Sequence, residues 1–209
     1  MPARPPMPSA PSAPPLAEPK AARYTPVAIG LHWLLALLIL GALALGLYMT
    51  GLPFSPQRVR FYSWHKWTGI AILLLSAVRL LWRLGHPPPG LPDFVRAAMP
   101  RWQRAGRTAS HRLMYLLFFA VPLLGWAQSS ALGVPVVWFG VLPLPDFVPV
   151  DRALAEHWLQ PLHRAGAYLL AAVSVLHVAA VVKHQWIARD GLLRRMWPGP
   201  SSTSRKPDA

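Results

Sequence analysis

Four long apolar segments limit what this 209-residue chain can fold into. The clearest of them, Val27–Met49, contains no charged side chain. A bilayer core about 30 Å thick is crossed by about 20 helical residues, so this segment is long enough to span it. Three further segments are nearly as apolar: Trp64–Leu84, His111–Ser130, and about Leu162 to Trp186. The sequence therefore predicts an all-α fold, a four-helix transmembrane bundle.

The composition supports a membrane protein and restricts its cofactors. Charged residues make up 13% of the chain, whereas soluble proteins average about 25%. There is no cysteine, which excludes disulfides, thiolate-bound iron–sulfur clusters and covalently attached c-type haem. The net charge of +14 is expected to face anionic lipid beside the membrane, so no nucleic-acid partner is predicted.

The two ends of the chain differ from its middle. Residues 1–19 are rich in Pro, Ala and Ser and lack the apolar core of a signal peptide. We expect a disordered Pro-rich tail over residues 1–22, a transmembrane domain over 23–198, and a second disordered tail over 199–209.

Charged residues between the segments predict the orientation in the membrane. The connection 131–161 holds three acidic residues and one arginine, whereas the connection 85–110 holds four arginines: Arg96, Arg101, Arg104 and Arg107. Because Lys and Arg concentrate on the cytoplasmic side, both termini are expected in the cytoplasm. Arg58 and Arg60, in the outer connection between the first two segments, depart from this rule.

Four histidines in the apolar segments sort into two levels. His163 and His177 are 14 residues apart, which is about 21 Å and close to four full turns, so they share one helix face. Under the predicted topology His65 lies at the depth of His163, and His32 at the depth of His177. Two pairs of opposed imidazoles suit two six-coordinate haems of the b type, with these four histidines as axial ligands to iron.

Other interpretations of the histidines remain open. A single histidine at a helix end is more often an interfacial or hydrogen-bonded residue, although intramembrane ionisable groups are usually functional. His184 competes with His177, but it would place the two irons about 31 Å apart along the helix, so His177 is preferred. His111 is expected to contact a haem propionate or a quinone, or else to be a plain interfacial residue.

Small residues near the histidines could make room for a flat macrocycle. Gly69 and Gly166 each lie about one turn beyond a histidine, and Gly41 and Gly46 lie deeper in the first segment. Glycines are also common in membrane helices because they help helices pack, so they add little by themselves.

Basic residues are expected near both levels. Arg79 follows His65 by 14 residues and should lie at the depth of the cytoplasmic pair, where it either binds a haem propionate or extends toward the headgroups. At the outer level we expect a cationic patch of Arg58, Arg60, Lys66 and Arg164. Such a patch would attract a small anion, pair with propionates or dock an acidic electron donor, although the acidic connection 131–161 weakens the first of these.

Four stretches together resemble the prokaryotic cytochrome b561 family: "YTPVAIGLHWLLALLI", "HKWTGIAILLLSAVRLLWRL", "HRLMYLLFFAVPLLGW" and "LHRAGAYLLAAVSVLHVAAVVKH". The resemblance covers about residues 24–198. It implies a bacterial inner-membrane protein with four helices, two haems linked to quinone, and haem ligands at His32, His65, His163 and His177. Members of the family include a superoxide:ubiquinone oxidoreductase.

The favoured hypothesis is a dihaem cytochrome that passes single electrons from superoxide, or from a periplasmic donor, to ubiquinone. A second hypothesis is a cytochrome b subunit that takes electrons from a partner oxidoreductase, because the family is also similar to such subunits of hydrogenases and formate dehydrogenases. A third is a non-redox membrane anchor without haem.

Overall fold

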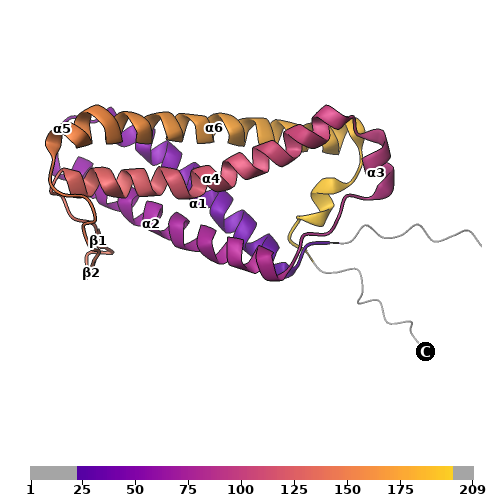
Figure 1. Cartoon of the computed structure of the whole chain (residues 1–209), viewed down its shortest axis with the longest axis horizontal. Helices are drawn as coiled ribbons and strands as arrows, with labels where there is room; N and C mark the ends of the chain where they lie inside the picture. Colours follow the sequence, from indigo (N-terminus) through magenta and orange to yellow (C-terminus); the bar gives the residue numbers. More distant parts are fainter. Residues whose placement is uncertain (1–22, 200–209) are drawn as a thin grey trace, which may run out of the picture.

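Four long helices run side by side in the computed structural model, which describes residues 23–199 (Figure 1). They are α1 (Pro26–Thr50), α2 (Pro56–Gly85), α4 (Arg101–Ala131) and α6 (Gln160–Val182). All four are long and apolar enough to cross a membrane, α6 together with the turns that flank it. The predicted four-helix transmembrane bundle is confirmed. The expected tails lie outside the described residues, apart from Gly199.

Shorter elements connect the long helices. Helix α3 (Asp93–Ala98) precedes α4, and the connection after α4 forms a hairpin of β1 (Val137–Trp138) and β2 (Leu142–Pro143). The fourth span begins with α5 (Arg152–Leu154) and the π-helical turn η1 (Ala155–Leu159). It ends with the π-helical turn η2 (Lys183–Ala188), after which comes the 3₁₀ turn η3 (Leu192–Arg195). We call the end with β1 and β2 the hairpin end and the other the terminus end.

Two helices begin earlier than the apolar pattern predicts. Helix α2 starts at Pro56 instead of Trp64, because the Ser55 hydroxyl caps it by accepting from the Arg58 amide at 3.2 Å and proline occupies the first helical position. Arg58 and Arg60, expected in a connection, therefore lie in the first turns of α2. Helix α4 likewise starts at Arg101 instead of His111. Both extensions are polar, and hydropathy detects only the part of a helix that lies in lipid.

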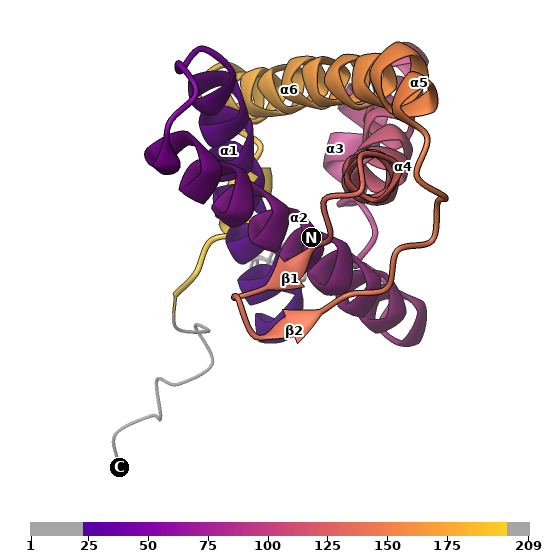
Figure 2. The same ribbon diagram turned by 90° about the vertical axis from the view of Figure 1, so that its left-hand side faces the viewer.

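Contacts between neighbouring helices hold the bundle together. Helix α2 packs against α1 and α4, and α4 packs against α6. Seen from the hairpin end, the four helices surround a central space (Figure 2). The middle of that space is filled by a core cluster of Leu35, Ile39, Ala42, Ile72, Leu117, Val121 and Leu170. Large apolar side chains such as Leu37, Leu81 and Leu176 point outward and are exposed, as expected for a surface that lipid covers.

The chain's last described turn is fixed to the terminus end. Arg195 is buried and donates hydrogen bonds to the carbonyl oxygens of Pro89 and Gly90 at 3.1 and 2.8 Å. The indole N–H of Trp33 in α1 donates to the Met196 carbonyl at 2.8 Å. These bonds hold η3 against the connection before α3 and against the first turns of α1.

Candidate functional site

The four intramembrane histidines form two pairs in space. At the hairpin end His65 of α2 lies opposite His163 of α6, with ring centroids 6.1 Å apart and an interplanar angle of 87°. At the terminus end His32 of α1 lies opposite His177 of α6, at 6.3 Å and 68°. The structure thus brings together the histidines that were predicted to lie at the same depth. Their role as ligands remains a prediction.

The separation within each pair fits a metal ion held between the rings. A metal–imidazole bond is about 2.1 Å and the nitrogen lies about 1.1 Å from the ring centre, so two rings on opposite sides of one metal have centroids about 6.4 Å apart. The observed 6.1 and 6.3 Å agree with this value. The ring of His111 lies only 5.2 Å from that of His177, which is too close for the same arrangement.

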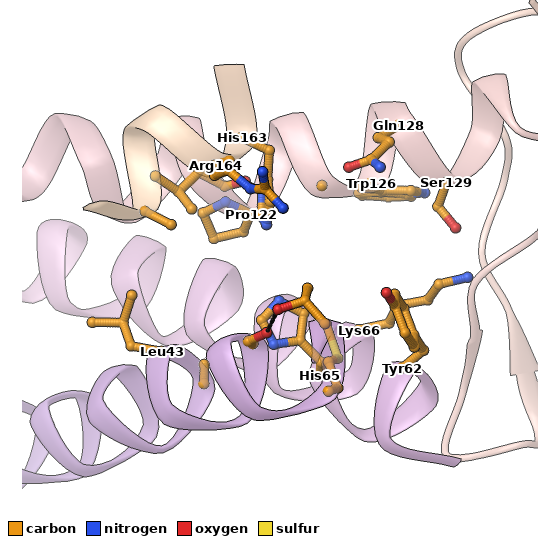
Figure 3. Close-up of a pocket in the computed structure, with 18 of the residues that line it drawn as sticks. Leu43, Tyr62, His65, Lys66, Pro122, Trp126, Gln128, Ser129, His163 and Arg164 are labelled. Carbon is orange, nitrogen blue, oxygen red and sulfur yellow. Dashed lines mark hydrogen bonds between the residues drawn. The ribbon is translucent and has the colours of Figure 1, made fainter. Parts of the chain in front are cut away.

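A cavity of about 570 Å³ surrounds the pair at the hairpin end. Ligand sites usually occupy about 300–1,000 Å³, so a cofactor-sized group can be accommodated. Figure 3 shows His65 and His163 on opposite sides of the space, with Tyr62, Lys66 and Trp126 toward its hairpin side. The lining is mostly apolar, and it comes from all four long helices and the connection that follows α4.

Two glycines give the rings of this pair room. A Cβ at Gly46 of α1 would lie 3.2 Å from Cε1 of His65, and a Cβ at Gly125 of α4 would lie 2.9 Å from Cε1 of His163. Each ring therefore contacts the backbone of a helix that contributes no histidine to this pair. Only a residue without a side chain allows so close an approach.

The sequence alone pointed to Gly46, together with three other glycines that do not touch a histidine ring. Nothing lies within 4 Å of a Cβ built at Gly41 or Gly69, and a Cβ at Gly166 would meet Val121 at 3.0 Å. Gly125 was missed because spacing along a helix identifies neighbours on that helix only. Its contact with His163 crosses from α4 to α6, and no local signal in the sequence reports such a crossing.

A hydrogen bond sets the orientation of His163. Its Nδ1 lies 2.9 Å from the carbonyl oxygen of Val121. A carbonyl can only accept, so Nδ1 carries the hydrogen and the lone pair of Nε2 is left available. This is the usual arrangement of a metal-ligating histidine, whose second nitrogen donates to a carbonyl or carboxylate.

At the terminus end Arg79 and His111 lie beside the His32–His177 pair. Arg79 points into the bundle, where its Nε donates to the Tyr115 hydroxyl at 3.1 Å and its Nη1 to the Ala28 carbonyl at 3.3 Å. His111 donates from Nδ1 to the Arg107 carbonyl at 2.7 Å and packs edge-on against His177. The Arg79 side chain therefore stays among protein groups in this structure instead of extending to the headgroups.

The four basic residues expected at the hairpin end are only partly brought together. Arg58, Lys66 and Arg164 line the cavity, whereas Arg60 is exposed on α2 and does not. Arg58 donates to the Tyr62 hydroxyl at 3.3 Å and lies over its ring. Lys66 is held by its ammonium, which donates to the Val134 carbonyl at 3.2 Å.

The remaining histidines have local partners. His184 in η2 pairs through Nδ1 with the Asp190 carboxylate. His32 lies opposite His177, and no described imidazole lies opposite His184 in this way. His86 stacks on Trp82 with ring centroids 4.0 Å apart, and His157 bonds to the Ala153 carbonyl within its own turn.

Comparison with known proteins identifies the family. A family model described as prokaryotic cytochrome b561 matches residues 23–199. The chain belongs to the prokaryotic cytochrome b561 family. It is 34% identical to "Cytochrome b561 homolog 2" of Escherichia coli (strain K12), over 86% of this chain and 94% of that protein. It is 30% identical to "Probable superoxide oxidase CybB" of Yersinia pestis, over 84% and 96%. A cytochrome b562 of Cereibacter sphaeroides is 28% identical over 83% and 94%.

Family membership defines the class of protein. This cytochrome b561 family member is a bacterial membrane protein of electron transfer, and the family implies b-type haem. The separations within the histidine pairs and the space that Gly46 and Gly125 leave show that the residues present fit such a group. A non-redox anchor is not supported by these relatives.

The contact between Gly125 and His163 gives a first prediction. Gly125→Ala places a methyl group where the His163 ring lies, so the ring or α4 must shift, and the free energy of unfolding is expected to fall by about 1–3 kcal/mol. Gly41→Ala is the matched control, because its Cβ meets nothing within 4 Å. Thermal unfolding in detergent measures both variants. Equal melting temperatures for Gly125→Ala and the parent would contradict the close approach.

Proposed function

We propose that this protein is a dihaem b-type cytochrome that transfers single electrons across the bacterial inner membrane to the quinone pool. His65 and His163 would hold one haem, and His32 and His177 would hold the other. The observation that carries the proposal is the 6.1 and 6.3 Å separation of the two ring pairs at opposite ends of one bundle. The arginine-rich connection 85–110 and both termini are assigned to the cytoplasm.

Haem iron supplies reversible one-electron chemistry when it is bound. The chain's own residues hold and insulate the two centres. Helix α6 carries one histidine of each pair, so the two levels are about 21 Å apart along a single rigid element. Core side chains such as Leu35 and Ile72 fill the space between the levels and exclude water from it.

The favoured overall reaction is the oxidation of superoxide by ubiquinone. Two superoxide ions each give up one electron and leave as oxygen, and one ubiquinone takes up two electrons and two protons to become ubiquinol. Two observations support superoxide as the donor. One relative is named as a probable superoxide oxidase, and Arg58 and Arg164 place positive charge at the cavity that holds His65 and His163.

A second candidate is a cytochrome b subunit that receives electrons from a partner oxidoreductase. It is favoured by the acidic side chains of the connection 131–161, Asp146, Asp151 and Glu156, which weaken the attraction of an anion to this end of the bundle. Purification of the native protein separates the candidates. A stoichiometric iron–sulfur or molybdenum subunit supports the second, and its absence together with rapid reduction by superoxide supports the first.

The ligand assignment predicts a pairwise pattern of haem loss. His65→Ala and His163→Ala are expected to perturb the same haem, and His32→Ala and His177→Ala the other, because each pair shares one iron. Haem quantitation and the reduced α-band spectrum of the purified variants measure this. His184→Ala is the control and should retain both haems, since no described imidazole faces its ring as His32 faces that of His177. Loss of a haem in His184→Ala but not in His177→Ala would disprove the assignment.

The anion hypothesis predicts a rate that depends on charge at the cavity. Arg58→Gln and Arg164→Gln are each expected to slow haem reduction by superoxide, by up to about tenfold at low ionic strength, with the effect shrinking as salt is added. Stopped-flow spectroscopy with pulsed superoxide measures the rate. Arg60→Gln is the matched control, because Arg60 is a nearby arginine that does not line the cavity. Rates of haem reduction equal to that of the parent in all three variants would reject anion attraction.

The bond between Tyr115 and Arg79 predicts an effect on the second centre. A positive charge held near His32 and His177 favours the reduced state, so Arg79→Gln is expected to lower the potential of that haem by about 50–100 mV. Tyr115→Phe, which frees the Arg79 Nε, is expected to lower it by a smaller amount. Redox titration resolves the two haems. Arg101→Gln, at the exposed start of α4, serves as the control and should leave both potentials unchanged.

A further inference from the structure

The connection between α4 and α5 contains a long uncharged segment. From Leu132 to Pro145 it reads "LGVPVVWFGVLPLP", and its single polar side-chain group is the indole N–H of Trp138. The β1–β2 hairpin lies in this segment and exposes its apolar tip. Phe139, Val141 and Leu142 are 62%, 83% and 52% exposed. A tip of this kind is unusual for a connection in water.

Reciprocal hydrogen bonds fix the hairpin to the side of α2. The indole N–H of Trp67 donates to the Val137 carbonyl at 2.6 Å, and that of Trp138 donates to the Trp67 carbonyl at 3.1 Å. The Phe139 ring packs against Trp67 with centroids 5.3 Å apart. The hairpin consequently lies beside the end of the bundle (Figure 1) and, seen end-on, in front of α2 and away from α6 (Figure 2).

The contact with Trp67 sets the level of the hairpin. Helix α2 begins at Pro56, so it continues about 16 Å beyond Trp67 toward the hairpin end. The apolar part of α2 begins at Trp64, one turn before Trp67. The hairpin is therefore level with the boundary between the polar start of α2 and its lipid-facing part, where Leu74 and Leu81 are exposed.

The turn of the hairpin gives an independent indication. Phe139 and Gly140 have φ values of +51° and +74°. Asn, Asp or Gly is usual at the first such position, because a bulky side chain is strained there. Phenylalanine is a poor choice for forming this turn, but its ring is well suited to an apolar surrounding.

We propose that the β1–β2 hairpin inserts its tip into the interface of the lipid bilayer. Phe139, Val141 and Leu142 enter the boundary between headgroups and acyl chains, next to Trp64 and Trp67 of α2, as expected for aromatic residues at this depth. Lipid fits better than a protein partner, because the segment offers no charge and its one indole N–H is already bonded to Trp67. The hairpin then fixes the height of the neighbouring cavity relative to the membrane surface. This inference does not depend on the electron donor.

Site-directed labelling tests the insertion on a clean background, because the chain has no cysteine. Val141→Cys in the full-length, haem-loaded protein is labelled with an environment-sensitive fluorophore and placed in lipid nanodiscs that contain nitroxide-labelled lipids. Leu81→Cys on the exposed face of α2 is the lipid reference, and Glu156→Cys in η1 is the aqueous reference. Haem spectra and melting temperature confirm that each labelled protein is folded.

The expected result is a blue-shifted emission at Val141→Cys and quenching by headgroup-region nitroxides to the extent seen at Leu81→Cys or beyond. Emission and quenching like those of Glu156→Cys would overturn the proposal and assign the tip to water or a soluble partner. Disulfide formation between Val141→Cys chains is checked before labelling, and the labelled sample holds one protein per nanodisc. A disulfide between two chains would overturn the proposal and assign the tip to a contact with a second copy of the protein.

A second variant separates membrane contact from turn stability. Phe139→Asn relieves the strained backbone position, so the melting temperature in detergent is expected to stay the same or rise. In nanodiscs the same change is expected to reduce quenching of the Val141→Cys label, because the aromatic ring no longer holds the tip in lipid. Unchanged quenching would show that Phe139 does not anchor the hairpin.

Discussion

The absence of water in the bilayer core is the constraint on which this structure depends. Backbone groups must bond within each helix, and polar side chains must turn inward and find partners there. The imidazoles of His32, His65, His163 and His177 all turn inward and face another imidazole across the bundle. His163 bonds to the Val121 carbonyl, whereas Nδ1 of His65 is buried with no hydrogen-bond partner among the described residues. Arg79 bonds to a tyrosine hydroxyl and a backbone carbonyl. The polar interior is therefore concentrated at two levels, with an apolar core between them.

Much of this arrangement follows from local sequence. The spans were predictable because about 20 consecutive apolar residues leave few alternatives to a membrane helix. The pairing of His163 with His65 and of His177 with His32 could be anticipated, since helical rise converts sequence position into depth. Depth does not give direction around a helix axis, so only the structure shows that the rings face each other.

Other features depend on contacts that sequence spacing does not report. The early start of α2 follows from the Ser55 cap, which lies outside the apolar window. Gly125 contacts His163 across two helices, and Lys66 bonds to the backbone of a distant connection. The hairpin was expected to be plain connection, because its strands have two residues each and its pairing with α2 relies on two indole groups. Apart from the Ser55 cap, which is a local contact to Arg58, these omissions are long-range contacts.

Helix α6 supplies one member of both histidine pairs, whereas α1 and α2 supply one each. The positions of both histidine pairs therefore depend on this one helix. A rotation or axial shift of α6 would displace a histidine of both pairs at once. A tilt of α1 or α2 would change the separation within one pair only. The widened π-helical turns at its two ends, η1 and η2, are where such torsion could be absorbed without breaking the straight segment between His163 and His177.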